Sequence, residues 1–228
     1  MADRSGSLKD AVYHAVLNDI DNDVYKPNDI LTESALISKY QHSKSPVREA
    51  LVELCRDNVL RSIPRCGYEV IRLDQGDIEE LMRVRYLLEG GYLKLNFYKY
   101  TDSQIAHLES LYHAFAEDTA DPFRSWDNNM QFHMALIQGT VRTQVVQYLE
   151  QIYRKLKVAF AQFYWKQYHL NMPASTHHDT PRHQAILNGV RQKDLNATLT
   201  ALKNDMSYLG NVYIELPDFF DLGRMSDA

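Results

Sequence analysis

The stretch Ser43-Lys44-Ser45-Pro46-Val47-Arg48-Glu49-Ala50-Leu51 predicts a short helix that presents hydrogen-bond donors near an exposed N-terminal end. Ser43 or Ser45 caps this helix, since a side-chain oxygen satisfies a backbone N–H that has no partner within the helix. Proline is tolerated in the first turn, where its missing N–H does no harm. One face of the helix is apolar and the other carries the donors Lys44, Ser45 and Arg48. A recognition helix that lies in a DNA groove requires this division.

The residues before this stretch predict two more helices. Residues 8–20 carry apolar side chains at helical spacing, and a proline-containing turn follows at residues 25–29. Thr32 is a candidate N-cap of a second short helix, which only a few residues separate from Ser43. Two short helices joined in this way have the spacing of a helix-turn-helix.

The residues after the stretch predict a two-stranded wing. Residues 59–63 and 68–72 are strand-like, and Gly67 in the tip between them is free to take a positive φ. Together with the three helices, this gives a winged helix-turn-helix domain over residues 1–73. We place a linker at residues 74–77, where the wing ends and a new helix begins.

Charge is distributed unevenly along the chain. The formal net charge is −5, which taken alone argues against a nucleic-acid partner. Residues 39–72, however, hold seven Lys or Arg against four Asp or Glu, whereas residues 1–38 hold three against seven. The positive charge therefore lies on the predicted recognition helix and wing. In combination with the helix pattern, this favours double-stranded DNA as the partner.

Composition bounds the class of the protein. A chain of 228 residues with 45% hydrophobic content has room for two packed domains. No apolar run approaches the roughly 18 residues of a transmembrane span, and the N-terminus has no signal-peptide pattern. We therefore expect a soluble, cytoplasmic protein. The two cysteines have no zinc-type partners nearby, and Cys55 is interpreted as a small core residue.

The chain beyond the linker has helical periodicity throughout. The predicted helices cover residues 78–98, 103–116, 122–139, 143–168, 181–190 and 194–213. Strand alternation is absent, so we predict an all-α bundle over residues 78–216, followed by a tail over residues 217–228. The fold class is thus mainly α, with a winged helix-turn-helix before a helical bundle.

Two histidines in this bundle suggest a buried polar site. Asn129 and His133 are four residues apart and so lie on one face of a helix whose other positions are apolar. Buried polar groups need partners, and His183 and Asp205 on two later helices could supply them. From these residues alone, a hydrogen-bonded core histidine and a metal ligand both stay open.

Residues 8–73 resemble the winged helix-turn-helix domain of GntR-type bacterial transcription regulators. The resemblance rests on the Pro27 turn, the Leu31-Thr32-Glu33 helix start, the Ser-Pro-Val-Arg-Glu-Ala-Leu run and the Arg65-Cys66-Gly67 wing tip. It implies that the recognition helix contacts phosphates or base edges and that the wing reaches the neighbouring minor groove. Two arginines usual in the family are replaced here by Ser34 and Lys44. On this resemblance the DNA-binding residues are Thr32, Glu33, Ser34, Ser43, Lys44, Ser45, Arg48, Arg65 and Gly67.

Residues 77–214 resemble the FCD effector domain of the FadR-like branch of the same family. The matched pieces are Arg85 with Leu88-Glu89, the Phe132-His133 pair, the Arg182-His183-Gln184-Ala185-Ile186-Leu187 run and Asp194. In that family four side chains bind one divalent metal, and the matching positions here are Asn129, His133, His183 and Asp205. An asparagine replaces the usual aspartate, and an aspartate replaces the usual last histidine. Two imidazoles, a carboxylate and an amide oxygen can hold Zn²⁺, Ni²⁺ or Mn²⁺ with coordination positions left open.

The resemblance also implies a small effector, because related regulators sense organic acids or sugar acids. A carboxylate could take the open positions on the metal, with Arg85 as the donor of a charge-assisted hydrogen bond. An ion pair between Arg85 and Glu89, one turn along the helix, is the alternative for this arginine.

These expectations together describe a ligand-responsive DNA-binding transcription regulator with no membrane association. Such regulators work as homodimers on palindromic operators, and residues 78–98 are the candidate dimer interface. That helix and the linker would couple ligand to DNA binding. Two alternatives stay open. One is a metal-dependent hydrolase or lyase built on His133 and His183, and the other is a metal-free regulator in which the four polar residues line an organic pocket.

Overall fold

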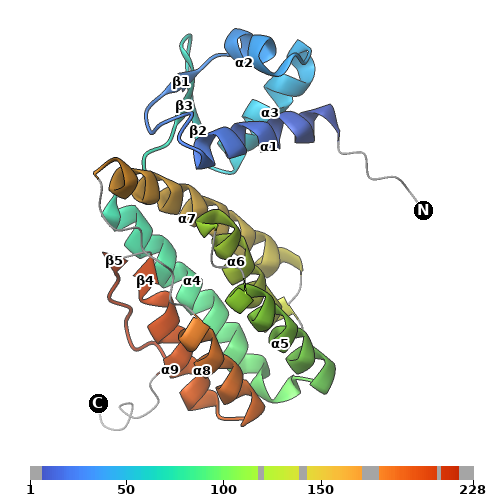
Figure 1. The fold of residues 1–228 in the computed structure, drawn as a ribbon, viewed down its shortest axis with the longest axis vertical. Helices are drawn as coiled ribbons and strands as arrows, with labels where there is room; N and C mark the ends of the chain where they lie inside the picture. The colour runs from blue at the N-terminus through green and yellow to red at the C-terminus, as the bar shows by residue number, and fades with distance from the viewer. Residues whose placement is uncertain (1–6, 118–120, 139–142, 171–179, 210–211, 221–228) are drawn as a thin grey trace, which may run out of the picture. The chain divides into compact units, whose positions relative to one another are not determined.

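The protein forms two compact units, which are described separately (Figure 1). The computed structural model describes residues 7–117, 121–138, 143–170, 180–209 and 212–220. The first unit holds the described residues up to Asp74 together with those from Arg154 to Leu170. The second unit holds those from Gln75 to Tyr153 and from Thr180 to Phe220. Among the described helices, none has both the length and the apolar character needed to cross a membrane.

The first unit contains the predicted helix-turn-helix. Its elements are α1 (Leu8–Asp21), β1 (Ile30–Leu31), α2 (Glu33–Tyr40), α3 (Lys44–Arg56), β2 (Leu60–Ile63) and β3 (Gly67–Val70). Thr32 is confirmed as the N-cap of α2, since its hydroxyl accepts from the backbone N–H of Ala35. Ser43, one of the two serines predicted as the cap, is the N-cap of α3, but its side chain makes no capping hydrogen bond. Pro46 at the third helical position has no N–H to donate.

The sheet of this unit has three antiparallel strands in the order β1-β3-β2, where the sequence predicted a wing of two. The extra strand β1 has only two residues, too few for an alternating pattern to be recognised. Gly67 has the predicted positive φ, 137°. A Cβ there would lie 2.4 Å from the carbonyl oxygen of Leu31 in β1. Glycine is therefore required because the backbone of β1 approaches it closely.

The first unit also includes the second half of α7 (Thr143–His169), which sequence analysis assigned wholly to the bundle domain. Val158 is 2% exposed and belongs to the core formed by α1, α3 and the sheet. The side-chain amide of Gln162 donates to the carbonyl of Ile71 over 2.7 Å. Arg154 Nη1 lies 3.0 Å from Oδ2 of the buried Asp57. These residues could not be assigned from helical periodicity, which does not tell which partner a face packs against.

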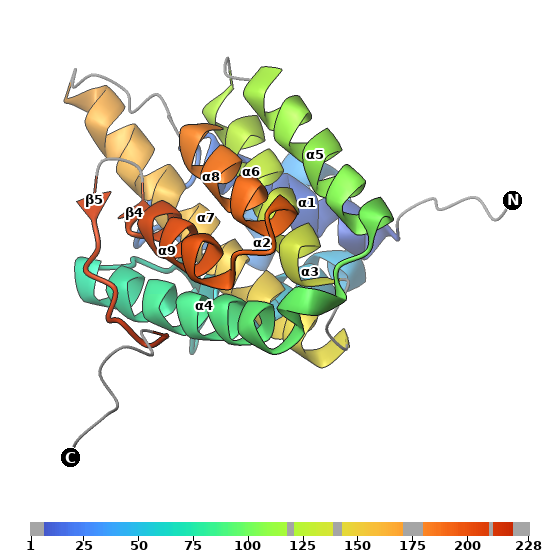
Figure 2. The same cartoon turned by 90° about the horizontal axis from the view of Figure 1, so that it is seen from below.

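The second unit is the predicted helical bundle. Its elements are α4 (Gln75–Asn96), the 3₁₀ turn η1 (Phe97–Lys99), α5 (Asp102–Glu117), α6 (Pro122–Gln138), the first half of α7, α8 (Thr180–Arg191), α9 (Leu195–Met206), β4 (Tyr208–Leu209) and β5 (Val212–Tyr213). Because α4 begins at Gln75, its first turn takes up most of the expected linker. Figure 2 shows α9 between α8 and α4.

The end of the bundle differs from the prediction in one respect. The helix expected over residues 194–213 ends at Met206, and the antiparallel pair β4–β5 follows it. The sequence between Leu209 and Val212 is Gly-Asn, which is a hairpin signal that the helical interpretation overlooked. Phe220, in the expected tail, packs on α4, where a Cβ on Gly90 would lie 2.4 Å from its ring.

Candidate functional site

A cluster of polar and charged side chains lies in the core of the second unit. Each member is less than one-tenth exposed, although most of its surroundings are apolar. Four helices and the first half of α7 supply it. The members are Arg85 and Glu89 from α4, Asn129 and His133 from α6, Tyr153 from α7, His183 from α8 and Asp205 from α9. A buried group of this kind is expensive unless its members satisfy one another or a ligand.

His133 is at the centre of the cluster. Its Nδ1 lies 2.9 Å from Oε2 of Glu89, and its Nε2 lies 2.9 Å from Oδ2 of Asp205. His183 approaches from α8, with its Nε2 3.6 Å from the other oxygen, Oδ1, of Asp205. The His183 ring stacks on Phe132 at a centroid distance of 4.4 Å, which fixes its plane. Both imidazoles and the aspartate are thus held by packing from three different helices.

Close approach of α8 and α9 brings the ligating atoms together. A Cβ on Gly189 of α8 would lie 2.3 Å from Oγ1 and 3.0 Å from the backbone N of Thr198 in α9. Only a residue without a side chain permits this spacing. As a result, one donor atom each from His133, His183 and Asp205 lies within 4.8 Å of the others. Asn129, the fourth predicted ligand, is buried one turn before His133 on α6.

Glu89 is one of two members of the cluster, with Tyr153, whose roles the sequence did not indicate. Its carboxylate accepts from Arg85 Nε over 2.7 Å and from the hydroxyl of Tyr153 over 2.5 Å, in addition to its contact with His133. The sequence indicated Glu89 only as an ion-pair partner of Arg85. The available signal was the spacing of four between these two residues on one helix. No local pattern connected Glu89 with His133, whereas the family resemblance had already implied that Arg85 lies near the metal site.

Arg85 uses only part of its guanidinium in the cluster. The ion pair of its Nε with Glu89 is present, as the alternative interpretation expected. The guanidinium also lies 5.0 Å from the ring centroid of Tyr153. Its Nη2 is buried and has no hydrogen-bond partner among the residues that the structure describes. Buried donors of this kind are rare in proteins, so this atom has capacity for an acceptor from a ligand.

The cluster sets the protonation of its members. Burial alone would raise the pKa of Glu89, but the charges of Arg85 and His133 lower it to about 2. Burial and Arg85 act to lower the pKa of His133, and the two flanking carboxylates outweigh them and raise it. Burial lowers the pKa of His183 to about 3 despite the nearby Asp205. His183 is therefore a neutral imidazole at physiological pH, the form that binds metals.

The donor set fits a divalent cation. Nε2 of His133 and Oδ1 of Asp205 each face another of the three ligands, at 2.9 Å from Oδ2 of Asp205 and 3.6 Å from Nε2 of His183, respectively. The Glu89 carboxylate next to Nδ1 of His133 is the usual support of a metal-binding histidine, since it fixes the tautomer and the ring orientation. Imidazole nitrogens with one carboxylate suit Zn²⁺, Ni²⁺ or Mn²⁺. We therefore consider this cluster the candidate metal and effector site.

A second candidate surface lies on the first unit. A hollow of about 520 Å³ is lined by six of the nine predicted DNA-binding residues, Thr32, Glu33, Ser34, Lys44, Arg65 and Gly67. Ser43, Ser45 and Arg48 are exposed at the start of α3. Arg48 Nε lies 3.5 Å from a carboxylate oxygen of Glu33 while its side chain stays 65% exposed. An ion pair this exposed is weak, so the arginine remains available to a phosphate or a base edge.

Two protein-family models match the parts of the chain that carry these two candidate sites. Residues 8–70 match the family model "Bacterial regulatory proteins, gntR family", and residues 80–207 match the model "FCD domain". The chain is 25% identical to the Uxu operon regulator of Haemophilus influenzae over 92% of its own length and 80% of that protein. It is 29% identical to the gluconate operon transcriptional repressor of Bacillus subtilis, over 59% of this chain and 54% of the repressor.

One solved structure supports the fold assignment. Escherichia coli McbR/YncC has a TM-score of 0.68 at 20% identity, with 88% of this chain and 94% of that chain covered. At this identity the likeness establishes the fold alone. Several curated relatives are matched over only 34% to 57% of their length. The effectors and operators of these relatives therefore cannot be assigned directly to this protein.

Proposed function

Because the chain belongs to the GntR family of bacterial regulatory proteins and carries an FCD domain, we propose that it binds a palindromic operator and senses a small organic or sugar acid through a divalent metal. The family and the relatives are transcription regulators. The protein is accordingly a ligand-responsive regulator of transcription and not an enzyme, which removes the hydrolase or lyase alternative.

The observation that carries the metal proposal is the convergence of His133, His183 and Asp205 from three helices, with donor atoms within 4.8 Å of one another. When bound, a divalent ion supplies positive charge and an open coordination position that a carboxylate can occupy. The side chains of the cluster would hold the ion, and Asn129 would add an amide oxygen. Glu89 would keep His133 oriented from the side away from the ion.

Arg85 supports an acidic effector. Its buried Nη2 can donate to a carboxylate, and a charge-assisted hydrogen bond of this kind is about twice as strong as a neutral one. A sugar acid is the favoured effector class because one relative is, by its name, a repressor of a gluconate operon. The free hydroxyls of such a molecule would reach the polar side chains around the cluster.

The first unit would contact DNA through α3 and the wing. The exposed donors Lys44, Ser45 and Arg48 would face the major groove, and Arg65 at the wing tip would reach the minor groove. We also propose that the protein acts in the cytoplasm as a homodimer. The dimer proposal rests on α4, which belongs to the bundle but exposes the apolar residues Val84, Leu87 and Leu95.

Elemental analysis of protein purified without chelators or affinity-tag nickel tests the metal proposal. We expect near-stoichiometric metal in the wild type and its loss in the His133→Ala/His183→Ala variant. Wild-type protein without metal that still answers a carboxylate effector would establish the metal-free alternative. A His133→Ala/His183→Ala variant that keeps its metal would place the ion elsewhere.

Operator binding tests the link between the two units. His133→Ala should abolish the response to an acidic effector but leave operator affinity without ligand nearly unchanged, since the site is not part of the DNA-binding surface. The coupling lost should be on the order of 1–3 kcal/mol, as for other allosteric regulators. A variant that still responds would place the effector site outside the cluster.

A further inference from the structure

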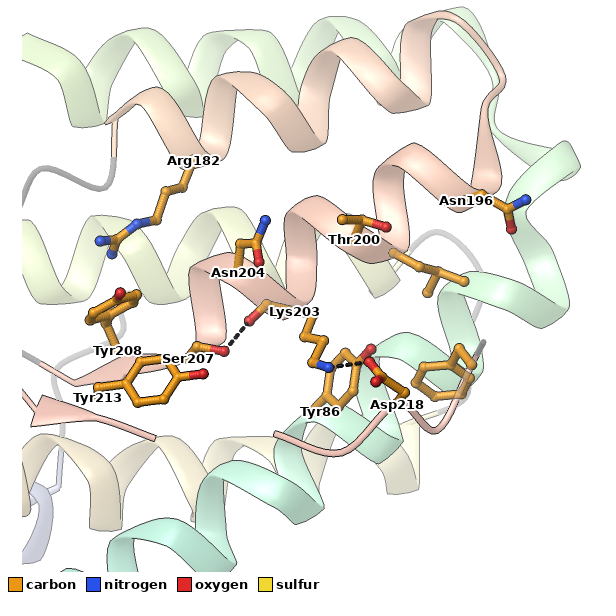
Figure 3. A pocket seen from close by; sticks show the side chains of 12 residues that line it. Tyr86, Arg182, Asn196, Thr200, Lys203, Asn204, Ser207, Tyr208, Tyr213 and Asp218 are labelled. Carbon is orange, nitrogen blue, oxygen red and sulfur yellow. Dashed lines mark hydrogen bonds and ion pairs between the residues drawn. The ribbon is translucent and has the colours of Figure 1, made fainter. Parts of the chain in front are cut away.

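A polar groove lies on the second unit, along the outer face of α9 (Figure 3). It has a volume of about 870 Å³ and runs between α9, the start of α8, Tyr86 of α4 and the chain that follows β5. Thr198, Leu202 and Asp205 are buried on the inner face of α9, whereas Asn196, Thr200 and Asn204 are exposed towards the groove. The spacing of four among the latter puts them in one row.

The lining of this groove combines hydrogen-bonding side chains with aromatic rings. The row on α9 offers two side-chain amides and a hydroxyl, and each of these can donate or accept hydrogen bonds. Tyr208 and Tyr213 close one end with their rings edge to face at 5.4 Å. Amides and hydroxyls next to aromatic rings suit a ligand that carries many hydroxyl groups on an apolar carbon frame.

Charge narrows the class of ligand. Arg182 lies with its guanidinium 4.3 Å over the ring of Tyr208, where stacking holds it in a fixed orientation. Lys203 belongs to the last turn of α9, and its ammonium group pairs with Asp218. Among the described residues that line the groove, Arg182 and Lys203 carry positive charge and Asp218 carries negative charge. This excess of cationic side chains favours an anionic ligand.

The carboxylate of Asp218 occupies the position beside Lys203 that an anionic ligand would take. This residue belongs to the chain segment after β5 and not to a helix, and its side chain is 70% exposed. An ion pair with so exposed a partner contributes little stability. A carboxylate or phosphate of an incoming ligand can take its place on Lys203. The groove is thus occupied at one end by a group that a ligand can displace.

We propose that this groove is a second ligand site, which takes a polyhydroxylated anion, a sugar acid or a sugar phosphate. Lys203 and Arg182 bind the acidic group, the row of Asn196, Thr200 and Asn204 binds hydroxyls, and Asp218 competes for Lys203. The site is independent of the buried cluster, because none of the cluster residues lines the groove.

Ligand-observed saturation-transfer NMR on the full chain tests the proposal. The titrations use the His133→Ala variant, in which the buried site is disabled, with gluconate and glucose 6-phosphate as probes. We expect at least one of them to bind with a dissociation constant on the order of 1 mM, as is usual for a small ligand in an open groove. The tighter probe shows whether a carboxylate or a phosphate is preferred. Glucose and acetate should bind at least about tenfold more weakly, since each lacks half of the recognised chemistry.

Three substitutions in that background complete the test. Lys203→Gln should weaken binding of the anionic probe about tenfold or more, whereas Lys193→Gln, an exposed lysine outside the groove, should leave it unchanged. Asp218→Asn should tighten binding severalfold because the competing carboxylate is gone. Absence of binding by both probes, or equal affinity in Lys203→Gln, overturns the proposal. If His133→Ala loses the effector response but still binds the probes in the groove, the buried cluster and the groove are two independent sites, and both proposals are supported.

Discussion

Nδ1 of His133 lies 2.9 Å from Oε2 of Glu89, and neither side chain is exposed to solvent. The contact joins α6 to α4, and the two residues are 44 positions apart in the chain. Because the carboxylate accepts at Nδ1, a neutral His133 would carry its proton there and direct Nε2 towards Asp205. The orientation of the central ligand thus depends on a residue that belongs to no metal-ligand pattern.

Glu89→Gln should destabilise the second unit by about 3–5 kcal/mol, because it leaves the buried Arg85 without its charged partner. In the fraction that folds, metal affinity should fall about 10- to 100-fold, as for other supports of a metal-binding histidine. Thermal unfolding and metal titration measure the two effects. Glu80→Gln, on an exposed position of the same helix, is the matched control. Wild-type stability in Glu89→Gln would show that the carboxylate does not anchor the cluster.

Gly189→Ala should separate α8 from α9, because the new methyl group would meet the backbone of Thr198 at 3.0 Å. Overpacking of this kind costs about 1–3 kcal/mol. Metal affinity should fall as well, since His183 and Asp205 are carried by the two helices that move apart. Asn188→Ala, the exposed neighbouring position, should change stability by less than about 0.5 kcal/mol. Denaturant unfolding of Gly189→Ala and Asn188→Ala gives the midpoint of unfolding of each variant. Equal midpoints would contradict the close approach of α8 and α9.

Arg48→Ala should weaken operator binding by about 1–3 kcal/mol and leave the fold intact, because the side chain is exposed and its pairing with Glu33 is weak. A gel-shift titration gives the affinity, and circular dichroism checks the fold. Arg56→Ala, at the opposite end of the same helix, is the control. If both variants bind as the wild type does, α3 is not the recognition helix.

Leu95→Glu should convert the dimer into a monomer if α4 forms the interface, because a charge cannot be buried there without a partner. The side chain of Leu95 is 72% exposed, whereas most large apolar residues of α4 face the bundle. Sedimentation at several concentrations gives the oligomeric state. The control is Leu170→Glu, since Leu170 is 61% exposed and lies outside α4. A dimer that survives Leu95→Glu but not Leu170→Glu would move the interface to the first unit.

Alkaline pH should weaken the first unit through Tyr13. Burial, together with the hydrogen bond of its hydroxyl to Asp57, raises the pKa of Tyr13 from its usual value of 10 to about 12. A raised pKa means that the stability from this bond is complete below about pH 10 and is lost as the pH rises through about 12. Tyr13→Phe should therefore be about 1.5–3 kcal/mol less stable than wild type at neutral pH.

That difference should shrink as the pH rises from about 10 to about 12, where the wild type loses the same hydrogen bond. Urea unfolding at a series of pH values measures it. Tyr98→Phe is the control, because Tyr98 is 74% exposed. A difference that is independent of pH would mean that the hydroxyl of Tyr13 is not coupled to folding.

Local sequence chemistry was enough to predict the three helices and the two-stranded wing of the first unit. The position of Pro46, the apolar stripe of α3 and the glycine at the wing tip each constrain the backbone within a few residues. The same proline removes the N–H that the side chain of Ser43 could bind at the third helical position, a consequence that the sequence already contained. The strand β1 and the hairpin after α9 were missed because two-residue strands have no periodicity of their own.

The candidate site, in contrast, could be predicted from the sequence only in part. The sequence alone indicates which side chains are present, which helices carry them, and that His133 and Asn129 share a face. The three-dimensional fold is needed to show that Glu89 supports His133, that Gly189 lets α9 approach α8, and that residues after Arg154 pack with the first unit. The two kinds of information differ in the distance along the chain over which the interactions act. Helical periodicity follows from bonds that span four residues, whereas a buried charge finds its partner by distance in space, which no local pattern records.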